Sequence, residues 1–190
     1  MQDRSVQNES ALVCAARRGD KEALQVLLKR HWAWLKGLVY GVLGDWRDLD
    51  DVLQEVCLRV ITRIHTVRDP DRFRGWLAIV ARREALKHLR RKPLGSIRQG
   101  PESLSSGSYA EDPLEGMAKR ELCDHILDAV KTLPEKYREV FVLAHTGELS
   151  YAEMAEVLGV PLTTMQIRLV RARRMIQNHI MGKRESQVQK

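Results

Sequence analysis

Aromatic residues are scarce in this chain of 190 residues, at 5%, whereas charged residues make up 30%. A β-sandwich would need more Val, Ile, Tyr and Phe, so this composition favours helices with one solvent-facing side. Hydrophobic residues still reach 44%, which is enough to bury a core and argues against wholesale disorder. The composition therefore predicts an all-α protein.

Long hydrophobic runs are also missing, because no segment approaches the roughly 18 apolar residues of a membrane-spanning helix. The first ten residues are polar and lack the apolar stretch of a signal peptide. Cys14, Cys57 and Cys123 are far apart, and none belongs to a Cys-x-x-Cys or Cys/His cluster with metal-ligand spacing. We expect a cytoplasmic protein with reduced cysteines, no membrane insertion, and no metal or cofactor.

The sequence shows no pattern that indicates catalysis. The six histidines are scattered and have no carboxylate spaced to orient them. A small nuclease would need clustered carboxylates or histidines, and the only such cluster, at 48–55, lies on an exposed helix face without a histidine partner. We therefore expect no catalytic residues and no enzyme activity.

The chain is basic, with a formal net charge of +7 and a pI of about 9.5. Such a balance favours an anionic partner such as nucleic acid or a membrane surface, but it is a weak signal alone. The position of the charges says more, because basic and acidic residues are segregated along the chain.

The order of elements predicts two helical domains and a linker. Apolar residues three and four apart predict helices at about 11–18, 20–43, 48–64 and 76–92, with Gly19 and Gly44 as stops and Pro70 as a break. Residues 93–116 are rich in Gly, Ser and Pro, are mildly acidic and have no helical period. We expect domains at 1–92 and 117–190, joined by a flexible linker at 93–116.

The strongest local pattern lies at 149–161. Ser150 and Glu153 form a capping box at the start of a short helix, and Gly159 permits a sharp turn at its end. After this turn, Thr163 or Thr164 can cap a second helix that runs to about residue 180. This arrangement is typical of a helix-turn-helix, which lays its second helix in the major groove of DNA.

The second helix of this motif has the residues of a DNA-binding face. Its apolar positions predict a buried stripe, which leaves an outward face of Gln166, Ile167, Val170, Arg171 and Arg174. From 168 to 184 the chain has six basic residues and no acidic one. Arg can bind guanine, Gln can bind adenine, and Ile or Val can contact a thymine methyl group. The alternative is a solvated basic face on an ordinary helical hairpin.

The first domain carries opposite charges on two helices. The helix at 48–64 is acidic on its solvent side, either to complement the helix dipole or to bind a partner. The next helix ends in six basic residues offset by Glu84 alone, which is more than the dipole requires and suits a nucleic-acid backbone. Phe73 and Trp76 could stack on unpaired bases, although their helical spacing favours a place in the core.

These motifs together resemble the extracytoplasmic-function sigma factors of bacterial RNA polymerase. DLDDVLQEV at 48–56 and FRGWLAIVAR at 73–82 are similar to region 2 of that family. LPEKYREVF at 133–141 and the segment 150–173 are similar to its region 4. The resemblance covers nearly the whole chain and implies a region 2 bundle and a region 4 helix-turn-helix, which together direct promoter-specific transcription initiation.

The resemblance also implies a role for each charged surface. Docking on the clamp helices of the largest polymerase subunit would use Asp48, Asp51, Gln54 and Glu55. Binding and melting of the −10 element would use Arg72, Phe73, Arg74, Arg82, Arg83, Lys87, Arg90 and Arg91. Recognition of the −35 element would use Thr163, Thr164, Gln166, Ile167, Arg168, Val170, Arg171 and Arg174.

The implied partners are core RNA polymerase, through its clamp helices and flap region, promoter DNA, and an anti-sigma factor of the kind this family often has. The acidic linker would thread the RNA exit path. Thr163, Gln166, Ile167 and Val170 depart from the residues common in the family, which predicts an unusual −35 sequence. The alternative function is a one-component helix-turn-helix regulator that acts without polymerase docking. Such a regulator would need a ligand-binding or dimerisation domain. The first domain, at 1–92, has no apolar pocket pattern and ends in a basic helix, so it does not resemble one.

Overall fold

The computed structural model describes residues 2–91 and 126–188, with side chains at 9–91 and 126–182. Within these ranges the elements are helices and short 3-10 turns, and there is no strand. The predicted linker at 93–116 lies outside the described residues. In the described part no helix is both long and apolar enough to cross a bilayer.

The first part of the chain forms a four-helix bundle. Its helices are α1 (Gln2–Arg17), α2 (Lys21–Leu43), α3 (Leu49–Arg63) and α4 (Phe73–Arg91), with the 3-10 turns η1 (Ile64–Thr66) and η2 (Pro70–Arg72) between the last two. The apolar stripes predicted from the sequence meet in a common core, which includes the fully buried Leu27, Leu35, Val56, Phe73 and Leu77. Burial of these side chains is the main force that holds the bundle together.

The ends of α2 follow from its local sequence, as predicted. The Asp20 carboxylate accepts hydrogen bonds from the backbone N–H groups of Glu22 and Ala23, at 2.9 and 3.0 Å. Gly44 ends the helix in the left-handed conformation, at φ 70°, where a residue with a Cβ would be strained. Within the bundle, α1 differs most from the prediction, because it begins at Gln2 rather than near Ala11. Its polar residue Glu9 is buried through contacts with distant parts of the chain, which helical periodicity does not reveal.

The second part is also helical. Residues 126–132 are helical and precede α6 (Glu135–Thr146), α7 (Tyr151–Leu158) and α8 (Leu162–Val188). The prediction that Thr163 or Thr164 caps α8 is wrong, because the Pro161 carbonyl already accepts the N–H of Met165 at 3.0 Å. Both threonines therefore lie in the first turn. The helix also continues past residue 180, to Val188.

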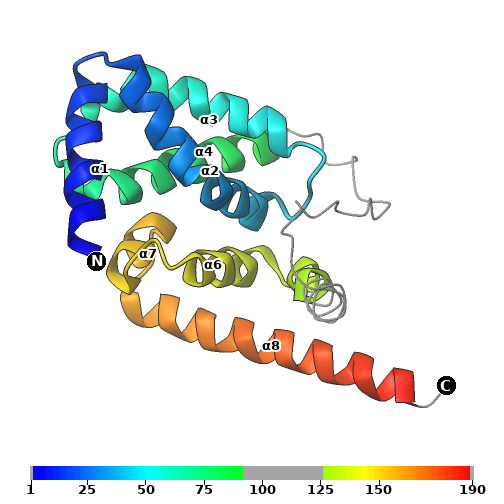
Figure 1. Ribbon diagram of the computed structural model, residues 1–190. Helices are drawn as coiled ribbons and strands as arrows, with labels where there is room; N and C mark the ends of the chain where they lie inside the picture. Colours follow the sequence, from blue (N-terminus) through cyan, green and yellow to red (C-terminus); the bar gives the residue numbers. More distant parts are fainter. Residues whose placement is uncertain (1, 92–125, 189–190) are drawn as a thin grey trace, which may run out of the picture.

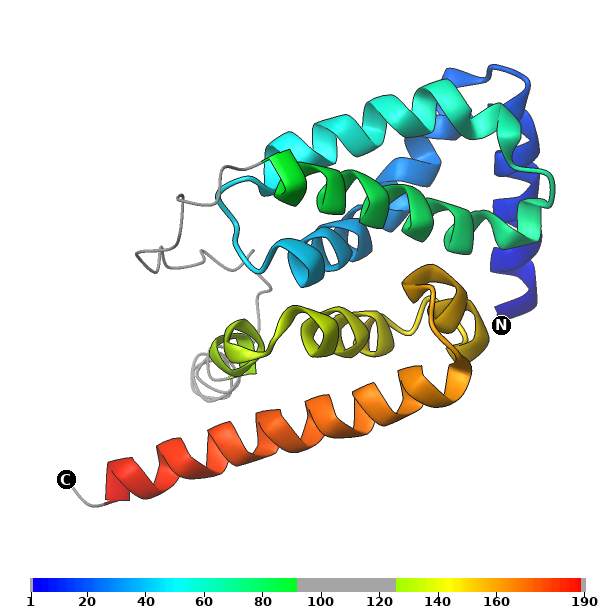
Figure 2. The same ribbon diagram turned by 180° about the vertical axis from the view of Figure 1, so that it is seen from behind.

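The two parts pack against each other in layers. In Figures 1 and 2, α6 and α7 lie between the bundle and α8, which forms the outer layer. The most extensive contact joins α2 to α6, and a second joins α4 to α7. Each half therefore presents one covered face and one open face.

Candidate nucleic-acid interface

The helix-turn-helix is built by the predicted local interactions. Glu153 accepts the backbone N–H of Ser150 at 2.8 Å, and the Ser150 hydroxyl accepts the N–H of Glu153 at 3.3 Å. Gly159 ends α7 at φ 66°, in the region where glycine is favoured over other residues. Because the turn between α7 and α8 is this short, the direction of α8 is fixed relative to α7.

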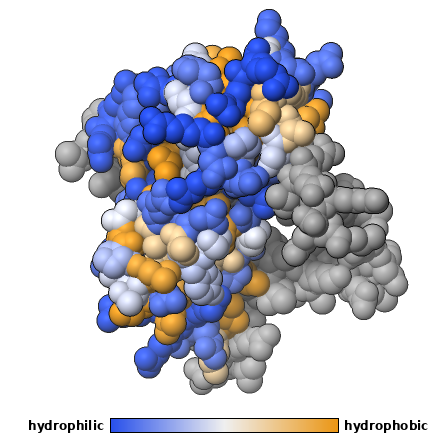
Figure 3. Space-filling model, turned by 90° about the vertical axis from the view of Figure 1, so that its left-hand side faces the viewer, coloured by the Kyte–Doolittle hydropathy of each residue, from blue (hydrophilic) through white to orange (hydrophobic). Residues whose placement is uncertain are grey.

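The first turns of α8 present the predicted face to solvent. Met165, Leu169, Ala172 and Ile176 are buried, whereas the exposed side includes Gln166, Ile167, Val170, Arg171 and Arg174. Ile167 and Val170 are 53% and 65% exposed, so both side chains are available to a partner. In Figure 3, hydrophobic atoms interrupt the hydrophilic surface in the lower part of the molecule.

The other predicted −35 residues lie around this face. Thr163 is exposed, and Thr164 and Arg168 are half-buried. A hydrogen bond with Arg171 is the main cause that lowers the pKa of Tyr137. Arg171 is exposed on the face of α8.

The acidic face of α3 lies on the bundle. Asp51, Gln54 and Glu55 are exposed, and Val52 and Val56 point into the core on the other side. Asp48 differs, because it is half-buried and its carboxylate lies 3.2 Å from His88 on α4. This pair fixes the start of α3 against the end of α4. The exposed carboxylates of Asp51 and Glu55 are not part of this pair and suit contact with a basic partner.

The apolar residues that border this acidic face were not predicted from the sequence. Leu58 and Ile61 are 58% and 53% exposed on α3. Next to them is a groove of about 700 Å³ between α2 and α3, lined mostly by apolar side chains that include Trp32, Leu28 and Cys57. The helical spacing of Gln54, Leu58 and Ile61 would have placed them on one side of α3. An acidic surface bordered by exposed apolar residues is typical of a protein–protein interface.

The predicted −10 residues on and before α4 fall into two groups. Arg83, Arg90 and Arg91 are exposed, and Lys87 binds Glu84 on the same helix at 3.0 Å. Burial opposes ionisation of Glu84, but Lys87 and Arg59 outweigh it and lower the pKa of Glu84. The second group, Arg72, Arg74 and Arg82, binds carboxylates that lie elsewhere in the chain.

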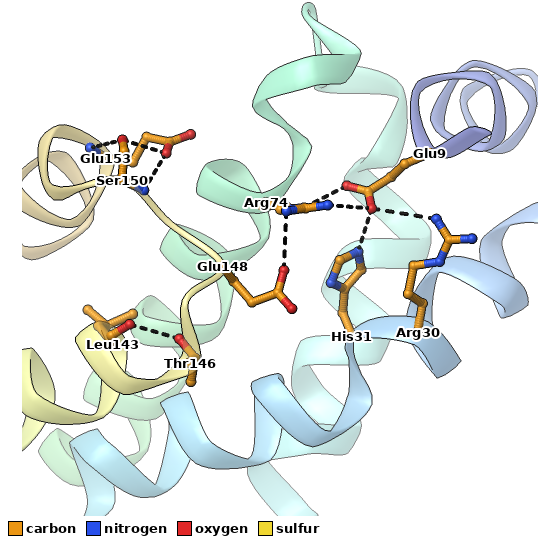
Figure 4. Close-up of polar contacts among 9 residues, drawn as sticks. All are labelled: Glu9, Arg30, His31, Arg74, Leu143, Thr146, Glu148, Ser150 and Glu153. Atoms are coloured by element: carbon orange, nitrogen blue, oxygen red, sulfur yellow. Dashed lines mark hydrogen bonds and ion pairs between the residues drawn. The ribbon is translucent and has the colours of Figure 1, made fainter. Parts of the chain in front are cut away.

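Arg74 is the centre of a polar cluster that joins three helices of the bundle. Its guanidinium donates to both oxygens of Glu9 on α1, at 2.9 and 3.1 Å. Figure 4 shows Glu9 also facing Arg30 and His31 of α2, and Arg74 facing Glu148 on its other side. Burial opposes ionisation of Glu9, but the hydrogen bonds from Arg74 and the charges of His31, Arg74 and Arg30 together outweigh it and lower the pKa of Glu9. Burial also lowers the pKa of His31, against the attraction of Glu9.

One predicted DNA contact has a structural role instead. Phe73 is fully buried and lies beside His31 and Trp76, with ring centroids 5.8 and 6.1 Å apart. Its ring is not available to a base in this conformation, so we leave Phe73 out of the proposed DNA-binding set. Trp76 is half-buried. The helical spacing of both aromatics already favoured a place in the core.

Family models match both helical parts of the chain. The model for Sigma-70 region 2 matches residues 27–93, and the model for Sigma-70 region 4 matches residues 124–176. The ECF RNA polymerase sigma-E factor of Haemophilus influenzae is 31% identical over 180 residues, which cover 90% of this chain and 95% of that protein. The chain belongs to the extracytoplasmic-function sigma factors.

Other relatives of this sigma factor agree. The RNA polymerase sigma-H factor of Pseudomonas aeruginosa is 28% identical and spans 90% of this chain and 92% of its own. The ECF RNA polymerase sigma factor SigW of Bacillus subtilis is 27% identical and spans 86% and 92%. The protein is therefore a sigma factor, which binds core RNA polymerase and directs promoter-specific initiation, and the one-component regulator is not favoured.

Solved structures support the same fold. CnrH, determined with the cytosolic domain of CnrY, has a TM-score of 0.66 at 23% identity, covering 92% of this sigma factor and 98% of that chain. The sigma factor RpoE of Bartonella quintana, determined with the anti-sigma factor NepR, has a TM-score of 0.68 at 16% identity, covering 83% and 96%. From here on, region 2 denotes α1–α4 and region 4 denotes α6–α8.

In the described residues, no group of three or more His, Cys, Asp or Glu side chains is placed to hold a metal ion. The carboxylates that bind the region 2 arginines were also not predicted from the sequence. Glu9, Glu139, Glu148 and Glu156 are separated from their partners by long stretches of chain. No local pattern in the sequence marks them.

Proposed function

We propose that this sigma factor starts transcription through three separate surfaces. The acidic face of α3, with Asp51, Gln54 and Glu55, docks on the clamp helices of the largest polymerase subunit. The exposed face of α8 recognises the −35 element, and the arginines on and before α4 bind the −10 strand. The proposed domain limits are 1–92 for region 2, 93–116 for the linker and 117–190 for region 4.

The observation that carries this proposal is the separation of charge and apolar surface in the fold. Exposed carboxylates and the exposed Leu58 share one face of α3, whereas the exposed face of α8 carries Gln166, Arg171 and two branched apolar residues. The first surface suits a basic protein partner. The second has the side chains that hydrogen-bond to base edges and contact thymine methyl groups in the major groove.

The partners follow from these surfaces. We propose that the chain works in the cytoplasm, where region 4 contacts the polymerase flap region. Both solved neighbours were determined with a second protein, which for RpoE is an anti-sigma factor. We propose that an anti-sigma factor also binds this chain, through the apolar border of the docking face.

Docking is tested by charge reversal on α3. The double variant Asp51→Lys/Glu55→Lys should lose at least about tenfold in affinity for core polymerase, because like charges face each other across the interface. Both residues are exposed, so the circular dichroism spectrum should not change. Co-purification with core enzyme measures the effect. The control is Glu22→Lys, an exposed reversal in the first turn of α2; equal binding by both variants contradicts the proposed docking face.

Promoter recognition is tested by transcription from a library of promoters with core polymerase. The full chain should enrich templates with a defined sequence at −35 and at −10. A chain that lacks residues 117–190 should lose selection at −35 and retain it at −10. If the truncated chain selects the same −35 sequences, the assignment of α8 is wrong.

A further inference from the structure

Helix α1 lies across the end of the region 2 bundle where the chain passes from α3 to α4 (Figures 1 and 2). It packs against α2 and against both 3-10 turns of that connection, η1 and η2. The family model for region 2 begins its match at residue 27, so α1 lies before the matched residues. Two side chains of α1 reach the segment that carries Arg72 and Arg74, which are proposed to bind the −10 strand.

A buried carboxylate stands on α1 where the packing would accept an apolar residue. Glu9, Val13 and Ala16 follow the i, i+4, i+7 spacing of one helix face, and all three are buried. A buried charge is costly unless it is paired, and even a paired one adds little stability compared with an apolar side chain. Glu9 is therefore better explained by the groups that it holds than by a contribution to the core.

Glu9 holds the guanidinium of Arg74 in one orientation. Its two oxygens accept hydrogen bonds from Nε and Nη2, at 2.9 and 3.1 Å, and this two-point contact fixes the plane of the group. Arg30 and His31 of α2 lie 3.6 and 3.4 Å from the same carboxylate and keep it in place (Figure 4). The remaining nitrogen, Nη1, faces the other way, toward Glu148. Arg74 thus offers an outside acceptor one nitrogen with a set direction.

The next residue of α1, Ser10, holds the turn before Arg74. Its hydroxyl donates a hydrogen bond to the carboxylate of Asp71 in η2. Phe73 is fully buried in the core, so the chain is anchored at three of four successive positions. Arg72 is the exposed residue among them. The two contacts from α1 therefore lie on either side of this arginine.

We propose that α1 is a positioning element for the −10 contact. Glu9 orients Arg74, and Ser10 fixes the turn that carries Arg72, so both arginines meet the strand from a set position. Such an arrangement sharpens selection, because the arginines do not have to be ordered when DNA binds and a poorly fitting sequence gains no adjustment from them. This inference rests on the proposed −10 function of Arg72 and Arg74.

Transcription from a promoter library tests Glu9→Gln and Ser10→Ala. Gln has a single acceptor oxygen, so it cannot hold both nitrogens of Arg74 in the same way. Each variant should lower the enrichment of the preferred −10 sequence several-fold and leave the enrichment at −35 unchanged. The matched control is Glu22→Gln, the same change at an exposed position in the first turn of α2, which should leave both enrichments unchanged. Ser10→Ala asks the same question without altering a buried charge.

The variant Arg74→Ala shows whether Glu9 acts through this arginine. Arg74→Ala should lower −10 enrichment, and the addition of Glu9→Gln should lower it no further, because the group that Glu9 positions is already absent. A further fall in the double variant overturns the inference.

Two other results also overturn it. Unchanged −10 enrichment in Glu9→Gln and Ser10→Ala means that α1 only supports the fold, and urea unfolding will then register a loss of stability alone. An equal fall at −10 and −35 means a general loss of active protein. If instead the wild-type chain selects no −10 sequence, or if Arg72→Ala and Arg74→Ala do not weaken that selection, the proposed function of these arginines fails, and this inference fails with it.

Discussion

The ion pair between Arg82 and Glu139 should be strongly asymmetric when it is broken from either side. Glu139 is 5% exposed, whereas the Arg82 side chain is 24% exposed. Burial raises the pKa of Glu139, against the attraction of Arg82. Arg82→Ala leaves the buried Glu139 carboxylate without its cation. Glu139→Gln leaves the Arg82 cation, which water can reach, and the new amide oxygen can still accept hydrogen bonds from Arg82.

The size of the effect of Arg82→Ala has an upper limit set by protonation. A glutamate has an ordinary pKa of 4.5, and protonating it costs about 1.4 kcal/mol per pH unit above that value. The unpaired carboxylate therefore costs at most about 3.4 kcal/mol at pH 7 and about 1.4 kcal/mol at pH 5.5, because it can take up a proton instead. We expect about 2–3 kcal/mol at pH 7, below the usual cost of breaking a fully buried pair. Glu139→Gln should stay within about 1 kcal/mol of the wild type.

Urea unfolding followed by circular dichroism measures both variants at the two pH values. The raised pKa means that the folded chain holds the Glu139 proton more tightly than the unfolded chain. The stability contributed by the Glu139 carboxyl group is thus present below pH 4.5 and is lost as pH rises through its raised pKa in the folded chain. Glu139→Gln should lack this pH dependence. Equal destabilisation by both variants at pH 7, or a cost of Arg82→Ala that does not fall at pH 5.5, would refute the reasoning.

Three shorter predictions concern other parts of the molecule. Arg171→Ala should cost about 1–3 kcal/mol of promoter binding and relax sequence selection at −35. Arg173 is exposed on another side of α8, so Arg173→Ala should leave this selection unchanged. Transcription from a promoter library measures the selection by each variant. Ser150→Ala removes the cap of α7 and should lower the free energy of unfolding by about 1 kcal/mol, as urea unfolding will measure. Burial lowers the pKa of His31 beside Glu9, so its stability contribution is present above pH 6.5 and is lost below it; unfolding of His31→Gln between about pH 5 and 7 should depend less on pH than that of the wild type.

Most of the fold could be predicted from the sequence because its signals are local. The limits of α7 depend on Ser150, Glu153 and Gly159, which interact across a few residues. The start of α8 was wrong because two threonines suited a cap, whereas Pro161 supplies the first carbonyl of the helix. The start of α1 was missed because Glu9 is held by Arg74, which lies 65 positions further along the chain.

The candidate surfaces divide in the same way. Helical periodicity identified the exposed faces of α3 and α8, since it depends only on neighbouring turns. It could not separate Arg82 and Arg72 from Arg83, because their carboxylate partners are 57 and 84 positions away. From the sequence, all these arginines looked like one DNA-binding surface. The fold gives some of them a partner within the protein.

The basic side chains on and before α4 differ in how available they are to DNA. Lys87 is tied to Glu84 within its own helix, and the arginines at the region 4 interface are occupied. Arg83, Arg90 and Arg91 are exposed. They can attract duplex DNA through its phosphates without sequence preference. We expect Arg72 and Arg82, which are paired with Glu156 and Glu139, to contribute less to this non-specific affinity than the three exposed arginines.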